Sequence, residues 1–230
     1  MPDATMHAAP SALIPDYLRD VYTWAYLTPL AIKIFDRQVA VQTILWGNAQ
    51  RLINAVLAEL TPGDRVFQPA AVYGSLSAQV AERIGPLGQL DVRDIAPIQV
   101  ALTRRKLAGY PQAHVTWGDA AAPAPGQYDV VNCFFLLHEV PDAVKAQVVP
   151  AMLRLARPGG KVVFVDYHRP HGWHPLKPLM TKIFDWLEPF AHTMWRREIA
   201  DFAGESAADW TWSKRTRFGG LYQIVVAAQR

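Results

Sequence analysis

Residues 65–77 decide how the chain is interpreted, and they read RVFQPAAVYGSLS. An apolar strand that ends at Gln68 runs through a turn into a segment with helical character. Nucleotide-binding folds place an acidic residue and several glycines at this point. Here the acidic position is Gln68, and the turn Ala71-Val72-Tyr73-Gly74 contains one glycine. The stretch predicts a strand–turn–helix unit whose ligand-facing groups are altered.

Apolar strands and helical segments alternate on both sides of this stretch, after helical-style residues that extend to about residue 60. Strands separated by helices of about ten residues indicate βαβ units and a mainly parallel sheet. Turns rich in proline and glycine precede the first, second and fifth strands. The expected strands are 65–68, 89–94, 114–117, 128–135, 161–167 and 221–228, and the expected helices are 75–84, 98–107 and 143–155.

Length and composition favour one domain over residues 1–230, because a chain of 230 residues that is 51% hydrophobic can bury a large core. Residues 1–60 are interpreted as an N-terminal helical lid, and residues 168–203 as a helical insertion or lid. Apolar residues from Leu176 to Leu187 recur at helical spacing with large aromatics beside them. That face is either core or the wall of an apolar substrate pocket or membrane-contacting lid.

Charge and cysteine content exclude several classes of protein. A net charge of +3 with dispersed basic residues argues against nucleic-acid binding. The single Cys133 excludes an intramolecular disulfide and lies in an apolar run, which predicts a buried thiol. Residues 1–10 lack the pattern of a signal peptide, and no apolar run is long enough to span a membrane. We expect a cytoplasmic protein, and the sequence makes no prediction of oligomeric state.

Two acidic residues follow strands at the edge where open α/β sheets bind ligands. Asp94 closes the second strand, where a carboxylate accepts hydrogen bonds from ribose hydroxyls, and Asp119 follows the third, where it would accept from an adenine amino group. An aspartate at either position alone is more often a helix cap or turn former. Together, at the spacing of a repeated βα unit, they favour an adenosine ligand.

Three segments carry a family resemblance: LTPGDRV at 60–66, GPLGQL at 85–90 and LARPGGK at 155–161. Over about residues 20–228 the chain resembles class I methyltransferases that depend on S-adenosylmethionine (SAM), in particular the ubiquinone/menaquinone C-methyltransferases. The resemblance implies a Rossmann-like, seven-stranded, mainly parallel sheet with an antiparallel last strand. The SAM-binding residues that it implies are Tyr26, Gln68, Val72, Tyr73, Gly74, Asp94, Asp119 and Ala120.

Departures from the quinone methyltransferases narrow the resemblance. At the position of Gln68 that family has an acidic residue, and at 71–74 it has a glycine-rich turn. Where this chain has His138-Glu139, that family has an Arg-Asn pair. The Gln-Pro and Val-Tyr-Gly form resembles the rhodoquinone biosynthesis family called RquA. This implies replacement of a methoxy group of ubiquinone by an amino group, with SAM as nitrogen donor and Mn²⁺ required.

Carboxylate and imidazole side chains suit Mn²⁺, and the resemblance is the reason for seeking them. The candidate ligands are His138, Glu139, Asp166 and His168, although no fixed metal spacing is matched and a lone histidine is more often structural. Tyr73, His138 and Glu139 are the candidate catalytic residues. Tyr73 either donates a hydrogen bond to the quinone oxygen or packs over the cofactor.

Neutral Gln68 suggests a physical basis for nitrogen donation, because losing a nearby carboxylate lowers the pKa of an amine and makes its free form more available. Two alternatives remain: a conventional quinone methyltransferase with a drifted first motif, and a non-catalytic scaffold that binds quinone. Long-tailed quinone lies in the bilayer, so we also expect peripheral contact with the inner membrane through residues 173–195.

Overall fold

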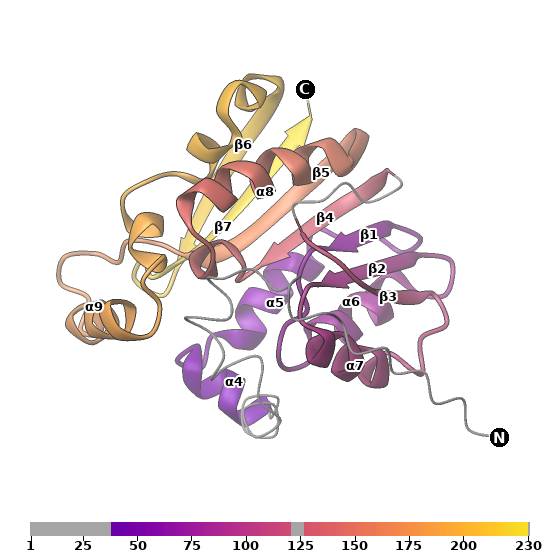
Figure 1. Cartoon of the computed structure of the whole chain (residues 1–230), viewed down its shortest axis with the longest axis horizontal. Coiled ribbons are helices and arrows are strands. Elements are labelled where there is room, and N and C mark those ends of the chain that lie inside the picture. The colour runs from indigo at the N-terminus through magenta and orange to yellow at the C-terminus, as the bar shows by residue number, and fades with distance from the viewer. Residues whose placement is uncertain (1–37, 121–126, 230) are drawn as a thin grey trace.

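The computed structural model of the chain describes residues 38–120 and 127–229, with side chains from residue 41 onward. Within these ranges seven strands form one sheet in the order β3-β2-β1-β4-β5-β7-β6 (Figure 1). Strands β1 to β5 are parallel, and β7 runs antiparallel between β5 and β6. The strands are β1 (Arg65–Gln68), β2 (Gln89–Asp94), β3 (Ala113–Trp117), β4 (Tyr128–Phe134), β5 (Ala156–Tyr167), β6 (Trp210–Arg217) and β7 (Tyr222–Gln229).

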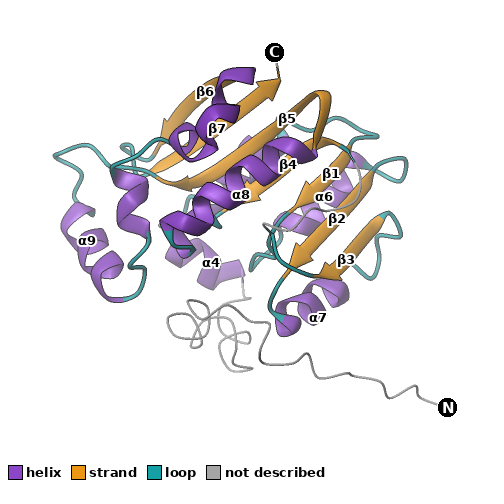
Figure 2. Cartoon of the chain, turned by 45° about the horizontal axis from the view of Figure 1, so that its top comes forward, coloured by secondary structure: helices purple, strands orange, loops and turns teal. Residues whose placement is uncertain are grey.

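Helices cover both faces of the sheet, as Figure 2 shows. One apolar layer joins α5, α6, α7 and α9 to the sheet, and the other joins α8 and η4 to the opposite face. The described helices are α4 (Gln38–Ile44), α5 (Ala49–Leu57), α6 (Leu76–Ile84), α7 (Pro97–Lys106), α8 (Asp142–Leu155) and α9 (Lys177–Trp186), with the 3₁₀ segments η2 (Leu137–Glu139), η3 (Ala191–Trp195) and η4 (Ile199–Asp209).

The expected alternation of strands and helices is confirmed, and most element ends shift by only one residue. The largest difference lies at 157–160, expected as a turn before the fifth strand. There β5 bulges, because pairing with β4 jumps from Tyr128↔Ala156 to Val130↔Lys161. Glycine is required in this bulge, since a Cβ on Gly160 would lie 2.9 Å from the backbone oxygens of Arg157 and Tyr128.

Strand β6 was not located from the sequence, although the resemblance implied seven strands. The segment reads WTWSKRTR, and its side chains are largely exposed apart from Trp210. An edge strand with a polar solvent face lacks the apolar run that identifies the central strands. The strand is placed by pairing along its whole length with β7.

The predicted lids are described in part. Residues 1–37, which include Tyr26, lie outside the described residues, and α4 and α5 account for the helical character expected from residue 38 to about 60. Residues 168–203 hold α9, η3 and the start of η4. None of the helices among the described residues combines the length and apolar character needed to cross a bilayer.

Candidate active site

A cavity of about 560 Å³ lies at the carboxyl edge of the parallel strands, between α4 and α9. The loops after β1, β2, β3 and β4 supply one part of its wall, and the two helices supply the other. This is the edge at which open α/β sheets bind ligands. Of the predicted site residues, those on the wall are Val72, Tyr73, Asp94, Asp119, Ala120, His138 and Glu139.

Asp94 ties the loop after β1 to the end of β2. Its carboxylate accepts hydrogen bonds from the backbone N–H of Ala71 at 2.8 Å and of Ala96 at 2.7 Å. Burial raises the pKa of Asp94 to about 6, against the lowering effect of these donors. Its side chain is still partly open to the cavity, and each carboxylate oxygen accepts more than one hydrogen bond. Asp94 is therefore able to hold the loop and a ligand hydroxyl together.

Gln99, on α7, is a residue that the sequence reasoning missed. Its side chain is 2% exposed and lines the cavity, and its Nε2 has no hydrogen-bond partner among the described residues. A buried amide donor without a partner is costly, so this group is suited to a ligand acceptor. The available signal was a glutamine on the same buried helix face as Thr103, one turn later.

Gln68 lies behind the cavity wall instead of on it. The side chain is fully buried, its Nε2 donates to the backbone oxygen of Ala70 at 2.7 Å, and its Oε1 accepts from Ser77 Oγ at 3.1 Å. An ionised acid has no proton to donate to the Ala70 oxygen, so the amide suits this place. Gly74 is also absent from the wall, and its positive φ of 83° fits the turn into α6.

His138 and Asp166 form a buried pair at the ends of β4 and β5. His138 Nδ1 lies 3.0 Å from Asp166 Oδ1, and the exposed fractions of the two side chains are 5% and 1%. Burial acts to lower the pKa of His138, but the charge and hydrogen bond of Asp166 outweigh it and raise the pKa to about 9. His138 is therefore an imidazolium near neutral pH, with Nε2 3.8 Å from Glu139 Oε1.

Aromatic rings fix the orientation of His138. Phe135 and Tyr167 stand edge-to-face with the imidazole, with ring centroids 5.6 Å and 4.8 Å away. Phe135 has a φ of 50°, and Trp46, also on the wall, has a φ of 51°. Strained backbone at bulky residues is typical of functional sites. The chain thus holds two aromatic side chains against the cavity at a conformational cost.

Of the four predicted metal ligands, His138 lies beside Asp166 and Glu139, and His168 lies apart from them. Both Asp166 oxygens are occupied by His138 Nδ1 and by the backbone N–H groups of Leu137, His138 and Tyr167. His168 is not on the wall, and its ring contacts the Gly220 oxygen and Lys214. Across residues 41–120 and 127–229, no three His, Cys, Asp or Glu side chains are grouped to hold a metal. The residues described do not form a ready manganese site.

The α4 and α9 segments give the cavity a mainly apolar wall. Met180, Ile183 and Leu187 from the α9 segment line the cavity together with Ile44 and Trp46 from the α4 segment. Sequence reasoning left the α9 face open between core and pocket wall. Met180 and Phe184 are buried and belong to the core, while Met180, Ile183 and Leu187 also line the cavity. The face is therefore partly core and partly cavity wall, and its contact with substrate or membrane stays a prediction.

Acidic groups dominate the charged part of the wall. Asp94, Asp119, Glu139 and Glu188 line the cavity, against the single imidazolium of His138 among its described lining residues. SAM carries a sulfonium and an ammonium group, which are opposite in charge to these four acids.

The fold is that of the class I SAM-dependent methyltransferases, and comparisons with known proteins agree. The structure resembles that of a SAM-dependent methyltransferase from Aquifex aeolicus, with a TM-score of 0.59 and 16% identity over 88% of this chain and 99% of that one. A family described as "Methyltransferase domain" matches residues 70–162.

Curated relatives point in the same direction. A ubiquinone/menaquinone biosynthesis C-methyltransferase of Ectopseudomonas mendocina is 30% identical over 62% of this chain and 56% of its own length. An uncharacterised methyltransferase of Synechocystis is 28% identical over 68% of this chain and 72% of its own length. The chain thus spans about half the length of the quinone methyltransferases that it matches.

Proposed function

We propose that the chain is a SAM-dependent transferase that acts on the ring of a ubiquinone-type substrate. The observation that carries the proposal is one cavity with two unlike sets of lining side chains: the polar Asp94 and Gln99 after β2, and the mainly apolar side chains of the α4 and α9 segments. An adenosine-type ligand suits the first, and a ring with an apolar tail suits the second. His138 lies on the same wall, where it would face the ring oxygens.

Within this class we infer nitrogen transfer, in which an amino group replaces a methoxy group of the ring. Bound in the cavity, SAM would supply either an electrophilic methyl group or, from its unprotonated amine, a nucleophilic nitrogen. The replacement at Gln68 supports the second: the neutral amide lies behind the wall and bonds to Ala70, so no carboxylate at the end of β1 adds to the groups that would hold the amine as ammonium. Val72 and Tyr73 occupy a turn that is glycine-rich in the quinone methyltransferases, and their side chains line the cavity.

His138 and Glu139 supply the proton transfers of this exchange. As the new C–N bond forms at the methoxy-bearing carbon, Glu139 accepts the proton that the nitrogen loses. His138 donates its Nε2 proton to the departing methoxide, which leaves as methanol. The nitrogen is then still bonded to the α-carbon of SAM, and the amino product forms only after that N–C bond breaks in a further step, to which we assign no residue. The separation of 3.8 Å between His138 Nε2 and Glu139 Oε1 lets the proton return to His138 and restores both groups. Tyr73 is proposed to donate to the quinone oxygen.

Manganese stays a prediction of the family resemblance. Of the predicted metal ligands, His138 and Glu139 line the cavity. The imidazolium form of His138 has no free lone pair for a metal. We assign no step of the exchange to a metal for this reason. Adding and removing Mn²⁺ during the assay tests the requirement independently of the proton transfers.

Methyl transfer to a quinone precursor is the second candidate. Similarity to quinone C-methyltransferases and the acid-rich wall, which suits a sulfonium, favour it. Two incubations separate the candidates: pure chain, SAM and Mn²⁺ with a short-tailed ubiquinone, and the same mixture with the precursor that lacks the ring methyl group, each followed by the product mass. The precursor is needed because every ring carbon of ubiquinone is already substituted. Exchange of methoxy for nitrogen supports our proposal, and an added methyl group supports the second candidate. Binding of both ligands without turnover would indicate the non-catalytic scaffold.

The Gln68 argument has its own test. The triple variant Gln68→Asp, Val72→Gly and Tyr73→Gly restores the acid and two glycines, and the matched control Gln79→Asp changes a glutamine on α6 that bonds to Gln50 and Ser75. We expect the triple variant to lose nitrogen exchange while it still binds SAM, and the control to retain both. Unchanged nitrogen exchange in the triple variant would overturn the role assigned to these residues.

A further inference from the structure

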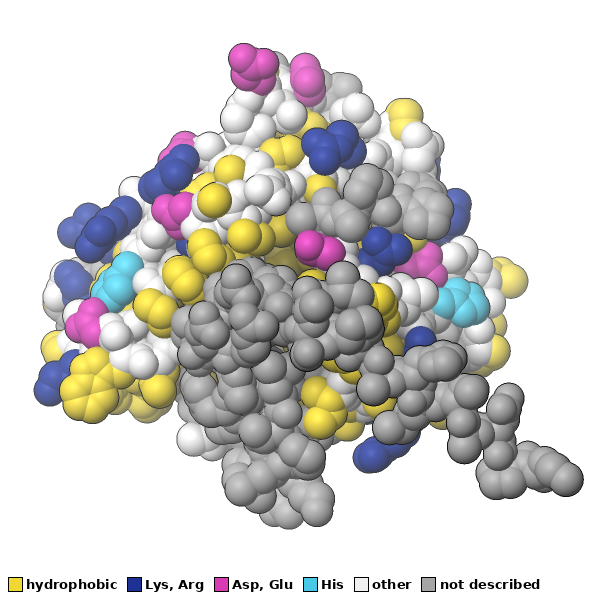
Figure 3. Space-filling model, viewed as in Figure 1, with side chains coloured by type: hydrophobic (Ala, Val, Ile, Leu, Met, Phe, Trp, Pro, Cys, Tyr) yellow, Lys and Arg dark blue, Asp and Glu magenta, His cyan; other side chains and the backbone are white. Residues whose placement is uncertain are grey.

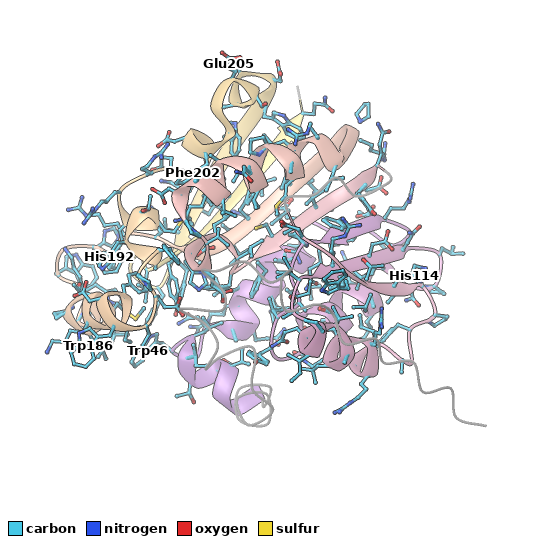
Figure 4. The ribbon with its side chains drawn as sticks, in the orientation of Figure 1. Trp46, His114, Trp186, His192, Phe202 and Glu205 are labelled. Carbon is cyan, nitrogen blue, oxygen red and sulfur yellow. The ribbon has the colours of Figure 1, made fainter. Side chains whose placement is uncertain are left out.

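Helix α9 has a second apolar face, which points away from the cavity. Leu179 and Trp186 are seven residues apart and so lie on one side of the helix, with Lys182 between them. Leu179 is 44% exposed and Trp186 is 84% exposed. We call Leu179, Lys182 and Trp186 the outer face of α9. Figure 4 labels Trp186 at the outer edge of the molecule, and Figure 3 shows hydrophobic side chains with basic ones around that edge.

Residues around the outer face repeat this combination of large apolar groups with positive charge. Trp173, in the loop that leads into α9, is 78% exposed. Residues 168–197 contain five Lys or Arg and two Asp or Glu, so they carry the full net charge of +3 of the chain. One of the two acids, Asp185, already lies 2.7 Å from His192.

The two faces of α9 connect the surface to the cavity. Ile183 and Leu187 line the cavity, and Leu187 is also 43% exposed. Across the opening, Ile44 both lines the cavity and is 46% exposed. Apolar side chains of the α9 segment therefore occur both on the outer face and on the cavity wall, and Leu187 belongs to the wall while partly exposed to solvent.

We propose that the outer face of α9 docks the protein on an anionic lipid bilayer, with Trp186 and Leu179 inserted at the interface and Lys182 facing lipid phosphates. Exposed tryptophan is favoured at the interface between hydrocarbon and water, and basic side chains are attracted by anionic lipid. Docking in this orientation presents the cavity opening to the membrane. That consequence rests on the proposed function, because it supplies a reason for a tail-bearing substrate to enter beside α9.

The test is binding of the full chain to vesicles without SAM or quinone, so its result does not depend on catalysis. The probes are vesicles of phosphatidylcholine and vesicles that also contain phosphatidylglycerol, separated by flotation. Leu179→Ser with Trp186→Ser removes the apolar part of the outer face. Leu87→Ser is the matched control, since Leu87 is 91% exposed in the turn before β2 and is remote from α9.

We expect the unaltered chain to bind the anionic vesicles. The double variant should bind them more weakly, by a factor of about ten or more. The Leu87 control should bind like the unaltered chain. Lys182→Glu should weaken binding to anionic vesicles by about tenfold and change binding to neutral vesicles little. Its control is Arg105→Glu, which alters an exposed residue of α7 and should change binding to either kind of vesicle by less. Thermal unfolding of each variant confirms that it is folded.

Three results would overturn the proposal: no binding of the unaltered chain to anionic vesicles, equal binding by the double variant, or a dimer in solution that the double variant loses. The last would assign the outer face to a second copy of the chain. Turnover of a short-tailed quinone should persist in the double variant, because neither altered residue lines the cavity. Failure of vesicle binding with turnover intact would reject the membrane proposal alone.

Discussion

Replacing His138 tests the buried pair on which the site depends. His138→Gln keeps a side chain of similar reach but removes the positive charge beside Asp166. The pKa of His138 is about 9 instead of the ordinary 6.5, so the pair stabilises the folded state by about 3 kcal/mol at low pH, at about 1.4 kcal/mol for each pKa unit. Asp166 would keep only its backbone donors, and breaking a buried pair costs about 3–5 kcal/mol.

The pH dependence has a defined sign. Between pH 6.5 and about 9 the folded chain holds a proton on His138 that the unfolded chain releases. The contribution of this proton to the free energy of unfolding should therefore be complete below pH 6.5, and it should be lost as the pH rises through this window. Urea unfolding over the same range measures it, and His138→Gln should lack that fall.

His114→Gln is the matched control, because His114 is exposed on β3 (Figure 4) and should change stability by less than about 0.5 kcal/mol. If His138→Gln unfolds at the same urea concentration as the unaltered chain and with the same pH dependence, then His138 and Asp166 do not form a stabilising ion pair. In that case the assignment of His138 as the proton donor to methoxide would fall with it.

Three other predictions concern the cavity. SAM affinity, measured by calorimetry, should rise as the pH rises through about 6, because ionised Asp94 is the better acceptor for ribose hydroxyls. Asp94→Asn should bind SAM more weakly, with an affinity that does not depend on pH in this range. A pH-independent affinity in the unaltered chain would contradict this role of Asp94. Gln99→Leu should lower SAM affinity by about tenfold and leave thermal stability equal or higher, since it removes an unpartnered buried donor, whereas a fall in stability with unchanged affinity would assign Gln99 to the core. His168→Ala should leave any activation by added Mn²⁺ unchanged, because His168 is not on the cavity wall, and loss of that activation in turnover assays would restore it as a ligand.

The central strands and the site edge follow from the sequence because parallel strands buried on both faces read as continuous apolar runs. Strand β6 does not, since an edge strand with polar side chains looks like a loop. The sequence predicts a turn instead of a bulge at 157–160 for a related reason. Glycines mark both turns and bulges within strands, so the local sequence does not distinguish the two.

Side-chain direction explains the different outcomes at the site. Gln68 and Val66 are two residues apart in β1, so both side chains point to the same face of the sheet, into the layer of α6 and away from the cavity. Period-two alternation could have predicted this. The His138–Asp166 pair could not be assigned as a pair, because it depends on the register of β4 and β5 and joins residues far apart in the chain.

The central claim is that nitrogen from SAM replaces a methoxy group of the quinone ring. The most direct measurement uses SAM with heavy nitrogen in its amino group and heavy carbon in its methyl group, incubated with the full chain, Mn²⁺ and a short-tailed ubiquinone. We predict a product that has gained the heavy nitrogen and lost one methoxy group, with no heavy carbon from the methyl group. No gain of heavy nitrogen by ubiquinone, together with transfer of the heavy methyl carbon to the precursor that lacks the ring methyl group, would contradict the claim and identify a methyltransferase.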